Sequence, residues 1–327
     1  MALLRLEPFP DFSKNLEKNR WADFLELSCL ESKDKEISLN DIITRYTQEE
    51  LSGISNGNEN HSLKVDGIRA NFMEIFKYIF SRMDFIDEFY PFLKVDEDTI
   101  KITKLDEKKL LYIFLLFSSN TSYITDKKIR PFFYLSFERI SIDIMKMIYP
   151  NFSNELFGTA TKKDDSFYGG KQIENLEKIG LFLNTSLKDN AKNNPHFRSS
   201  SGDTGIDIIS YITIDKETCA AAMLPACVGQ CSTSYSEWFI KQLSIKSSSL
   251  NNLFENIAAY HEYMFVSFPL RGINGKWAYE EASKIQTIMI DRIRFLNILH
   301  LNNKSTLLSD EMSVYMKTIL GNFDVAF

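Results

Sequence analysis

Two short polar stretches in the second half of the chain contain the residue types that metal-assisted hydrolysis requires. The first is Gly202-Asp203-Thr204-Gly205-Ile206-Asp207, before an apolar segment, and the second is Gly229-Gln230-Cys231-Ser232, at the end of another. Carboxylate and amide oxygens are ligands that Mg²⁺ accepts, and a bound Mg²⁺ polarises a phosphoryl oxygen and lowers the pKa of a bound water. The two stretches together indicate hydrolysis of a phosphodiester.

This chemistry requires that Asp207 and Gln230 meet at the ends of adjoining strands. Residues 206–214 are rich in β-branched side chains, which predicts a buried strand. The residues DKET then form a turn, and 219–231 form a second apolar strand with an irregular start at Pro225. Gly205 allows the backbone to approach closely just before Asp207. We therefore expect the two side chains to face each other.

Further polar groups lie on the helices predicted around these strands. Glu174 belongs to a helix over 171–186, and Lys241 to a helix around 235–245. A third strand is predicted at 262–270 and a long helix at 277–300. The second half is thus predicted as a mixed sheet flanked by helices.

The first half of the chain is predicted to be mainly helical. A short strand or hairpin is expected at 94–104, where the residues alternate. The block 149–171 contains a proline, paired glycines and charges, which indicates a domain boundary. We place a helical domain at 1–155 and a second domain at 156–327, in an α+β or α/β fold. Helical periodicity is found at 16–30, from Ser38 or Asn40 to Tyr46, at 67–92, at 105–119 and at 131–149.

The order of these residues resembles the PD-(D/E)XK superfamily of restriction-endonuclease-like nucleases, in its Mrr-like branch with a glutamine in place of the second acid. The resemblance covers residues 165 to 300 and nothing in the first half. It implies that Asp207 and Gln230 hold a metal ion together with the backbone carbonyl of Cys231. It further implies that Glu174 is the helix acid, with Asp203 as an accessory acid.

The chain departs from this pattern at Ser232, where the superfamily has a lysine that orients or activates the attacking water. Lys241 is the candidate for a lysine that has migrated to the following helix and points back to the strand ends. Without a lysine, the site would bind nucleic acid or metal and cleave poorly. A plain structural interpretation also stands, in which Asp203 and Asp207 cap a loop and a strand start and Gln230 forms hydrogen bonds at a strand end.

The resemblance implies a Mg²⁺- or Mn²⁺-dependent DNA endonuclease in a bacterial anti-phage or restriction system, run with a protein partner such as an ATPase or sensor. The helical half would then serve partner docking or regulation. Arg198 and Arg271 are candidates for nucleic-acid binding, or are scattered salt-bridge partners. The alternatives are a catalytically inactive, nuclease-like scaffold that binds a protein partner or DNA, and a small-molecule hydrolase built on the same aspartates.

Composition limits these functions. The chain has 327 residues and a net charge of −6, so nucleic acid would have to bind at a local basic patch. Its four cysteines lack CxxC spacing and only four histidines accompany them, which argues against structural zinc. The N-terminus has no signal-peptide pattern, and the longest apolar runs, at 110–117 and 131–137, are too short to span a bilayer. We expect a cytoplasmic protein without a membrane partner.

Overall fold

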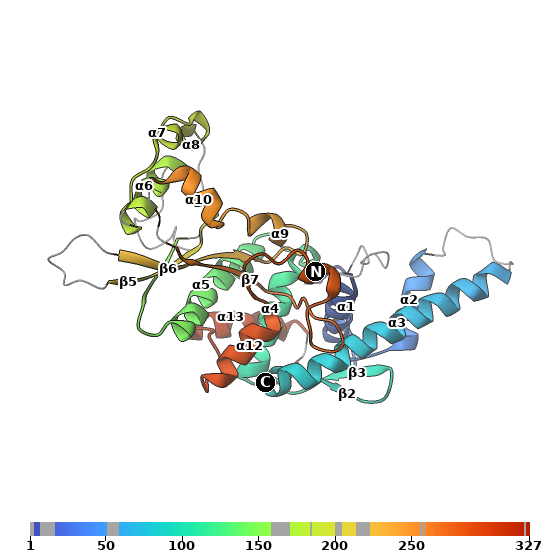
Figure 1. Ribbon diagram of the computed structural model, residues 1–327. Coiled ribbons are helices and arrows are strands. Elements are labelled where there is room, and N and C mark those ends of the chain that lie inside the picture. Colours follow the sequence, from blue (N-terminus) through green and yellow to red (C-terminus); the bar gives the residue numbers. More distant parts are fainter. Residues whose placement is uncertain are drawn as a thin grey trace. The chain divides into compact units, whose positions relative to one another are not determined.

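The chain forms two compact units, which Figure 1 shows in a computed structural model. Unit 1 comprises Met1–Lys127, Pro269–Ser283 and Leu308–Phe327, and unit 2 comprises Lys128–Phe268 and Lys284–Leu307. The sequence placed a boundary between residues 155 and 156, whereas the compact units divide first between 127 and 128. The structure describes residues 3–6, 17–50, 59–157, 171–183, 185–199, 205–213, 223–255, 257, 259–323 and 325–327.

Unit 1 is mainly helical, with a small antiparallel sheet of order β1-β3-β2. Its core is aromatic: the ring of Trp21 packs edge-on against those of Phe24, Tyr46 and Phe72. The predicted hairpin at 94–104 is present as β2 and β3. The elements of unit 1 are α1 (Glu17–Glu31), β1 (Glu36–Ser38), α2 (Leu39–Glu50), α3 (Glu59–Ile86), the 3₁₀ helix η1 (Asp87–Phe89), β2 (Phe92–Lys94), β3 (Thr99–Ile102), α4 (Glu107–Ser119), the 3₁₀ helix η2 (Thr121–Tyr123), α11 (Tyr279–Ala282) and α13 (Asp310–Gly321).

Unit 2 is built on a five-stranded mixed sheet of order β4-β5-β6-β7-β8. Strands β4, β5 and β6 pair antiparallel, and β7 and β8 continue the sheet in parallel pairs. The strands are β4 (Ser153–Leu156), β5 (Ile208–Thr213), β6 (Met223–Ser232), β7 (His261–Val266) and β8 (Ile288–Ile290). The helices are α5 (Arg130–Ile148), α6 (Gln172–Phe182), α7 (Asp189–Lys192), α8 (Pro195–Ser199), α9 (Trp238–Lys241), α10 (Ser247–Leu253) and α12 (Arg292–Leu301).

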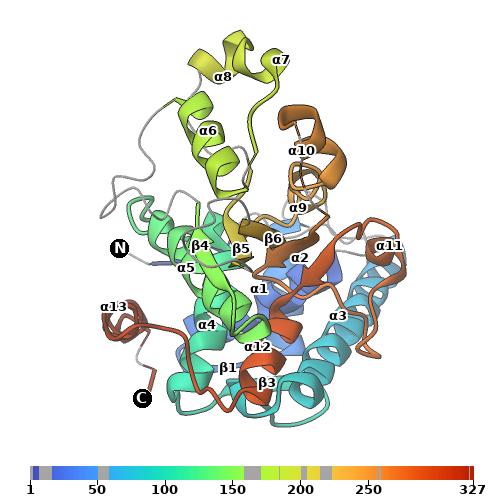
Figure 2. The same ribbon diagram turned by 60° about the vertical axis from the view of Figure 1, so that its left-hand side comes forward.

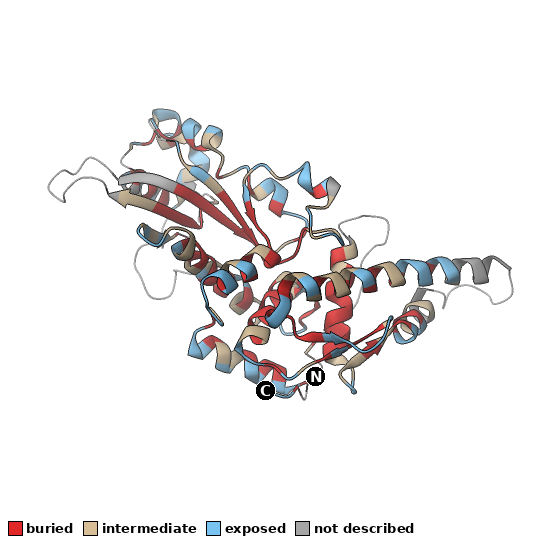
Figure 3. Cartoon of the chain, turned by 60° about the horizontal axis from the view of Figure 1, so that its bottom comes forward, coloured by how far each residue is buried: buried red, intermediate tan, exposed pale blue. Residues whose placement is uncertain are grey.

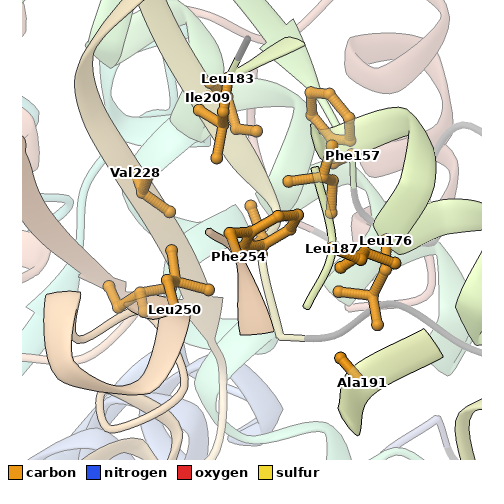
Figure 4. Close-up of a cluster of buried hydrophobic side chains, with 12 residues drawn as sticks. Phe157, Leu176, Leu183, Leu187, Ala191, Ile209, Val228, Leu250 and Phe254 are labelled. Atoms are coloured by element: carbon orange, nitrogen blue, oxygen red, sulfur yellow. The ribbon is translucent and has the colours of Figure 1, made fainter. Parts of the chain in front are cut away.

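Helices cover both faces of this sheet (Figures 1 and 2). On one face, Met145 of α5 contacts Cys227 of β6. On the other face, Ile209 of β5 and Val228 of β6 belong to a buried cluster with residues of α6 and α10 (Figure 4). The central strands are accordingly buried (Figure 3). The predicted fold class, a mixed sheet flanked by helices after a mainly helical first half, is confirmed.

Two predicted segments differ from the structure. The helix predicted over 277–300 is interrupted by β8, because Ile288 and Ile290 pair with β7, and α12 begins only after Asp291, whose side chain accepts a hydrogen bond from the Arg294 amide as an N-cap. The block at 149–171, predicted as a connection, contains the edge strand β4. Among the described residues, no helix has the length and apolar character needed to cross a bilayer.

Candidate functional site

A cavity of about 390 Å³ in unit 2 lies where β5 begins and β6 ends. Three of the predicted site residues, Asp207, Gln230 and Lys241, line it, together with Cys231. Its wall also includes residues that the sequence did not single out, from α5 and from the segment between β6 and α9. These are Tyr134, Phe137, Glu138, Thr233, Ser234 and Glu237.

Asp207 is fixed by the two strands on either side of it. Its backbone N–H donates to the Gly229 carbonyl oxygen at 2.9 Å, and its carbonyl oxygen accepts from the Phe157 N–H at 2.6 Å. Its side-chain Oδ2 accepts from the Cys231 backbone N–H, also at 2.6 Å. A buried carboxylate thus has one oxygen held by the neighbouring strand, which orients the whole group.

Gln230 lies on β6 next to Gly229, whose carbonyl oxygen accepts the Asp207 N–H. The antiparallel register of β5 and β6 begins at the pair Ile208 and Gly229. Asp207 and Gln230 therefore lie at adjoining strand ends and line the same cavity. That their side chains face each other stays a prediction.

Ser244, just after α9, contacts Gln230. The Ser244 hydroxyl lies 2.6 Å from Gln230 Oε1 and 3.2 Å from the Gly205 carbonyl oxygen. Gly205 has φ of +80°, and a Cβ there would lie 2.5 Å from Ser244 Oγ. Glycine is needed at this position both for its backbone conformation and for space.

Glu138 on α5 supplies a further carboxylate of the cavity, beside Asp207 and Glu237, and sequence reasoning missed it. The Cys231 thiol is close to Asp207 and Glu138: burial, and then the charges of these two acids, raise its pKa well above its usual value. Glu138 is one of several charged residues on α5, so its position in the sequence did not mark it as a site residue.

Glu174, predicted to be the helix acid, is not among the residues that line the cavity. It is exposed in the first turn of α6, where its carboxylate accepts a hydrogen bond from the Lys171 N–H at 3.2 Å. A glutamate at this position caps the helix, and its negative charge interacts favourably with the positive N-terminal end of the helix dipole. In the structure Glu174 caps α6, and its role as the helix acid stays a prediction.

Lys241 reaches the cavity from α9, as predicted for a lysine that replaces the one absent at residue 232. Its Nζ lies 3.8 Å from Glu237 Oε2, one helical turn earlier, and 39% of its side chain is exposed. Ser232 is buried and contacts Ser234 in the turn after β6. Lys241 thus brings a positive charge to a cavity that is also lined by the carboxylates of Asp207, Glu138 and Glu237.

The arginines predicted to bind nucleic acid are not among the residues that line this cavity. Arg198 is exposed on α8, where it donates to the Lys192 carbonyl oxygen at 2.8 Å. Arg271 belongs to unit 1, where its guanidinium lies 3.5 Å from the ring centroid of Trp277. Asp203 and Cys219 lie outside the described residues.

The donor set fits a hard divalent cation. Among the described residues, no three side chains of His, Cys, Asp or Glu gather as a complete metal cluster. The three carboxylates of Asp207, Glu138 and Glu237 and the Gln230 amide are oxygen ligands of the kind that Mg²⁺ or Mn²⁺ accepts, and Mg²⁺ is commonly held by one or two carboxylates while it keeps several waters. They do not suit a structural zinc site, which needs four protein ligands.

Comparison of the chain with family models, with curated proteins and with solved structures finds no match. The site is therefore interpreted from its own geometry.

Proposed function

We propose that unit 2 is a metal-dependent nuclease that hydrolyses DNA phosphodiester bonds, with the site at Asp207. The observation that carries the proposal is that Asp207 and Gln230, from adjoining strand ends, line one cavity with Glu138 and Lys241. The resemblance to PD-(D/E)XK nucleases agrees with the mixed sheet and its flanking helices, and it supplies DNA as the substrate.

In this mechanism Asp207, Glu138 and the Gln230 amide oxygen bind Mg²⁺ or Mn²⁺, with the Cys231 carbonyl oxygen as a further ligand. When bound, the ion supplies Lewis-acid activation of the phosphoryl group and of a water. The Cys231 N–H donates to Oδ2 of Asp207 and so fixes the orientation of the carboxylate. The Lys241 ammonium stabilises negative charge that develops on the phosphate as the water oxygen bonds to phosphorus and the P–O ester bond breaks.

The second candidate function is a non-catalytic scaffold that binds DNA or a protein partner. Ser232 at the position of the superfamily lysine favours it, as does the approach of Lys241 to Glu237 at 3.8 Å. A lysine held by a glutamate has less charge available for a phosphate. A small-molecule phosphodiesterase is the third, since a cavity of about 390 Å³ also accommodates a small ligand.

Cleavage of supercoiled plasmid by the whole chain with Mg²⁺ or Mn²⁺ tests the proposal. The wild type is expected to nick or linearise the plasmid, and Lys241→Met is expected to lower the rate by about 10²-fold, the typical cost of removing one charge-stabilising group. Lys146→Met, which removes an exposed lysine paired with Asp143 elsewhere on unit 2, serves as the control. Hydrolysis of a small phosphodiester without any action on plasmid or single-stranded DNA would assign the third function instead.

The cellular setting is proposed from the resemblance: a cytoplasmic bacterial anti-phage or restriction system in which unit 1 serves partner docking or regulation, with an ATPase or sensor as the partner. Addition of such a partner would then raise the plasmid cleavage rate. Arg198 and Arg271 remain candidates for phosphate contacts, which a loss of DNA affinity in Arg198→Ala and Arg271→Ala would support.

A further inference from the structure

The cavity in unit 2 has hydrogen-bond donors in its wall as well as acids. The hydroxyls of Thr233 and Ser234 and the ammonium of Lys241 come from the segment that follows β6, and we call these three residues the donor wall. The carboxylates of Asp207 and Glu138 come instead from the start of β5 and from α5. Sequence reasoning did not single out either hydroxyl.

The two hydroxyl residues are held in place by the residues on either side of them. Before them, Ser232 is buried, and its hydroxyl accepts a hydrogen bond from the Ser234 N–H at 3.3 Å. After them, the ring of Tyr235 stacks on that of Phe268, with the ring centroids 4.0 Å apart. Thr233 and Ser234 are half-buried between these two contacts, so their positions in the cavity wall are set by the fold.

Both hydroxyls have a hydrogen that a ligand in the cavity can accept. Within the described part of the chain, the Thr233 hydroxyl has no hydrogen-bond partner. Ser234 Oγ lies 3.1 Å from Ser236 Oγ. A serine hydroxyl has one hydrogen and two lone pairs, so Ser234 can accept from Ser236 and donate its own hydrogen elsewhere. The Lys241 ammonium adds further donors and one positive charge, at 3.8 Å from Glu237.

We propose that Thr233 and Ser234 are substrate-binding residues that donate hydrogen bonds to the non-bridging oxygens of a DNA phosphate, beside the Lys241 ammonium. Phosphate oxygens accept from serine and threonine hydroxyls, and hydrogen bonds to an ionised acceptor are about twice as strong as those between neutral groups. The carboxylates of the cavity repel a phosphate, and the donor wall offsets that repulsion. The inference rests on the proposed function, because it concerns the same site, but it requires no bound metal ion.

Fluorescence anisotropy of two labelled DNA duplexes of unrelated sequence, titrated with the whole chain, tests the inference. Binding is measured both with EDTA and with CaCl₂, since Ca²⁺ also takes oxygen ligands. Thr233→Val, which keeps the branched shape and removes the hydroxyl, is expected to weaken binding of both duplexes about tenfold, the cost of one hydrogen bond to a charged group. Ser234→Ala should give a loss of the same order. Thr233→Ser keeps the hydroxyl and should stay within about twofold of the wild type.

Thr318→Val is the matched control, because the Thr318 hydroxyl bonds to the Val314 carbonyl oxygen on α13 and is not part of the cavity lining. It should leave DNA affinity unchanged, and thermal unfolding verifies that every variant is folded. Wild-type affinity in both Thr233→Val and Ser234→Ala, or an equal loss in Thr233→Val and Thr233→Ser, would overturn the inference. A loss confined to one duplex would show a base contact and overturn it as well, because phosphate contacts are independent of sequence. Those results leave the proposed function standing, whereas a wild type that binds neither duplex in either buffer would overturn both.

Discussion

Each unit of the molecule contains acidic side chains beside a cation, and the two clusters differ in what satisfies the carboxylates. In unit 1, Arg82 Nη1 lies 2.8 Å from Asp23 Oδ1 and 2.6 Å from Glu26 Oε1, and all three side chains are 3% exposed or less. In unit 2, Asp207 and Glu138 line a cavity to which Lys241 contributes a partly exposed ammonium group. We call the cluster of Arg82, Asp23 and Glu26 the closed cluster, because it is buried. We call the cluster of Asp207, Glu138 and Lys241 the open cluster, because it lines a cavity.

The acids of the closed cluster accept hydrogen bonds from several protein groups. Tyr90 and Tyr112 donate their hydroxyls to Glu26, each at 2.7 Å. Asn120 donates to Asp23 Oδ2 at 3.0 Å. Burial, followed by the charge of Glu26, raises the pKa of Tyr90 well above its usual value, so this hydroxyl stays a donor. Buried acids with this many partners stabilise one arrangement of helices and leave no ligand position for a substrate.

The open cluster differs in its surroundings. The Asp207 carboxylate accepts a hydrogen bond from the Cys231 backbone N–H through Oδ2. The carboxylates of Asp207 and Glu138 border a cavity and not a packed core. Acids of the same type therefore serve structure in one unit and, as we propose, chemistry in the other, according to whether they border a space that a ligand can enter.

The largest expected effect is a loss of folding stability when the closed cluster loses its cation. Arg82→Met leaves Asp23 and Glu26 buried without their cation, and should lower the free energy of unfolding by about 3–5 kcal/mol. Urea denaturation monitored by circular dichroism measures it. Lys18→Met is the control: Lys18 pairs with Glu74 at 2.7 Å near the surface, and its loss should cost about 1 kcal/mol or less. Equal effects of the two changes would contradict the structural role of the closed cluster.

Alkaline pH should destabilise both units through their buried thiols. Burial raises the pKa of Cys29 in unit 1 and of Cys227 in unit 2 to about 12. Because these folded-state values lie above the unfolded value near 9, the stabilisation is complete below about pH 9 and is lost as the pH rises from 9 to 12. Each thiol should cost about 2 kcal/mol by pH 10.5. Urea midpoints at pH 8 and 10.5 measure the loss, and Cys29→Ala and Cys227→Ala should each reduce it; an unchanged loss in both variants would refute this cause.

Substituting each of the two helix acids of unit 2, Glu138 on α5 and Glu174 on α6, tests which of them contributes to metal binding. Glu138→Gln removes a carboxylate charge from the cavity and should weaken Mn²⁺ binding about tenfold, the lower end of the range for metal-site substitutions. Glu174→Gln should leave Mn²⁺ affinity unchanged and alter stability by about 0.5 kcal/mol or less, since glutamine also caps a helix. Calorimetric titration of each variant decides between them. A larger loss in Glu174→Gln than in Glu138→Gln would return the role of helix acid to Glu174.

Local patterns in the sequence were enough to predict most elements and the pair at the centre of the site. The amphipathic stripe of 131–149 corresponds to α5, and the β-branched run of 206–214 to β5. Asp207 and Gln230 were predicted to lie at adjoining strand ends because β5 and β6 follow each other in the chain and pair antiparallel, so their proximity depends on consecutive strands. Lys241 followed from the short connection between β6 and α9.

The features that the sequence did not predict depend on contacts between residues distant in the chain. Glu138 reaches the cavity because α5 packs on the sheet that β5 and β6 form some seventy residues later, and no local spacing encodes that approach. The interruption of the predicted helix at 277–300 arises because pairing with β7 stabilises Ile288 and Ile290 as a strand. The residues of the closed cluster in unit 1 come from α1, α3 and α4 and have no shared motif.

Binding of Mn²⁺ tests the central claim most directly, because it requires neither a DNA substrate nor a protein partner. Calorimetric titration of the wild type should show one saturable site per chain, and Asp207→Asn should abolish it while thermal unfolding without metal shows a folded variant. Asp143→Asn, which changes a partly exposed aspartate on α5 that pairs with Lys146, should leave it intact. No saturable binding by the wild type, or equal binding by Asp207→Asn, would contradict the account.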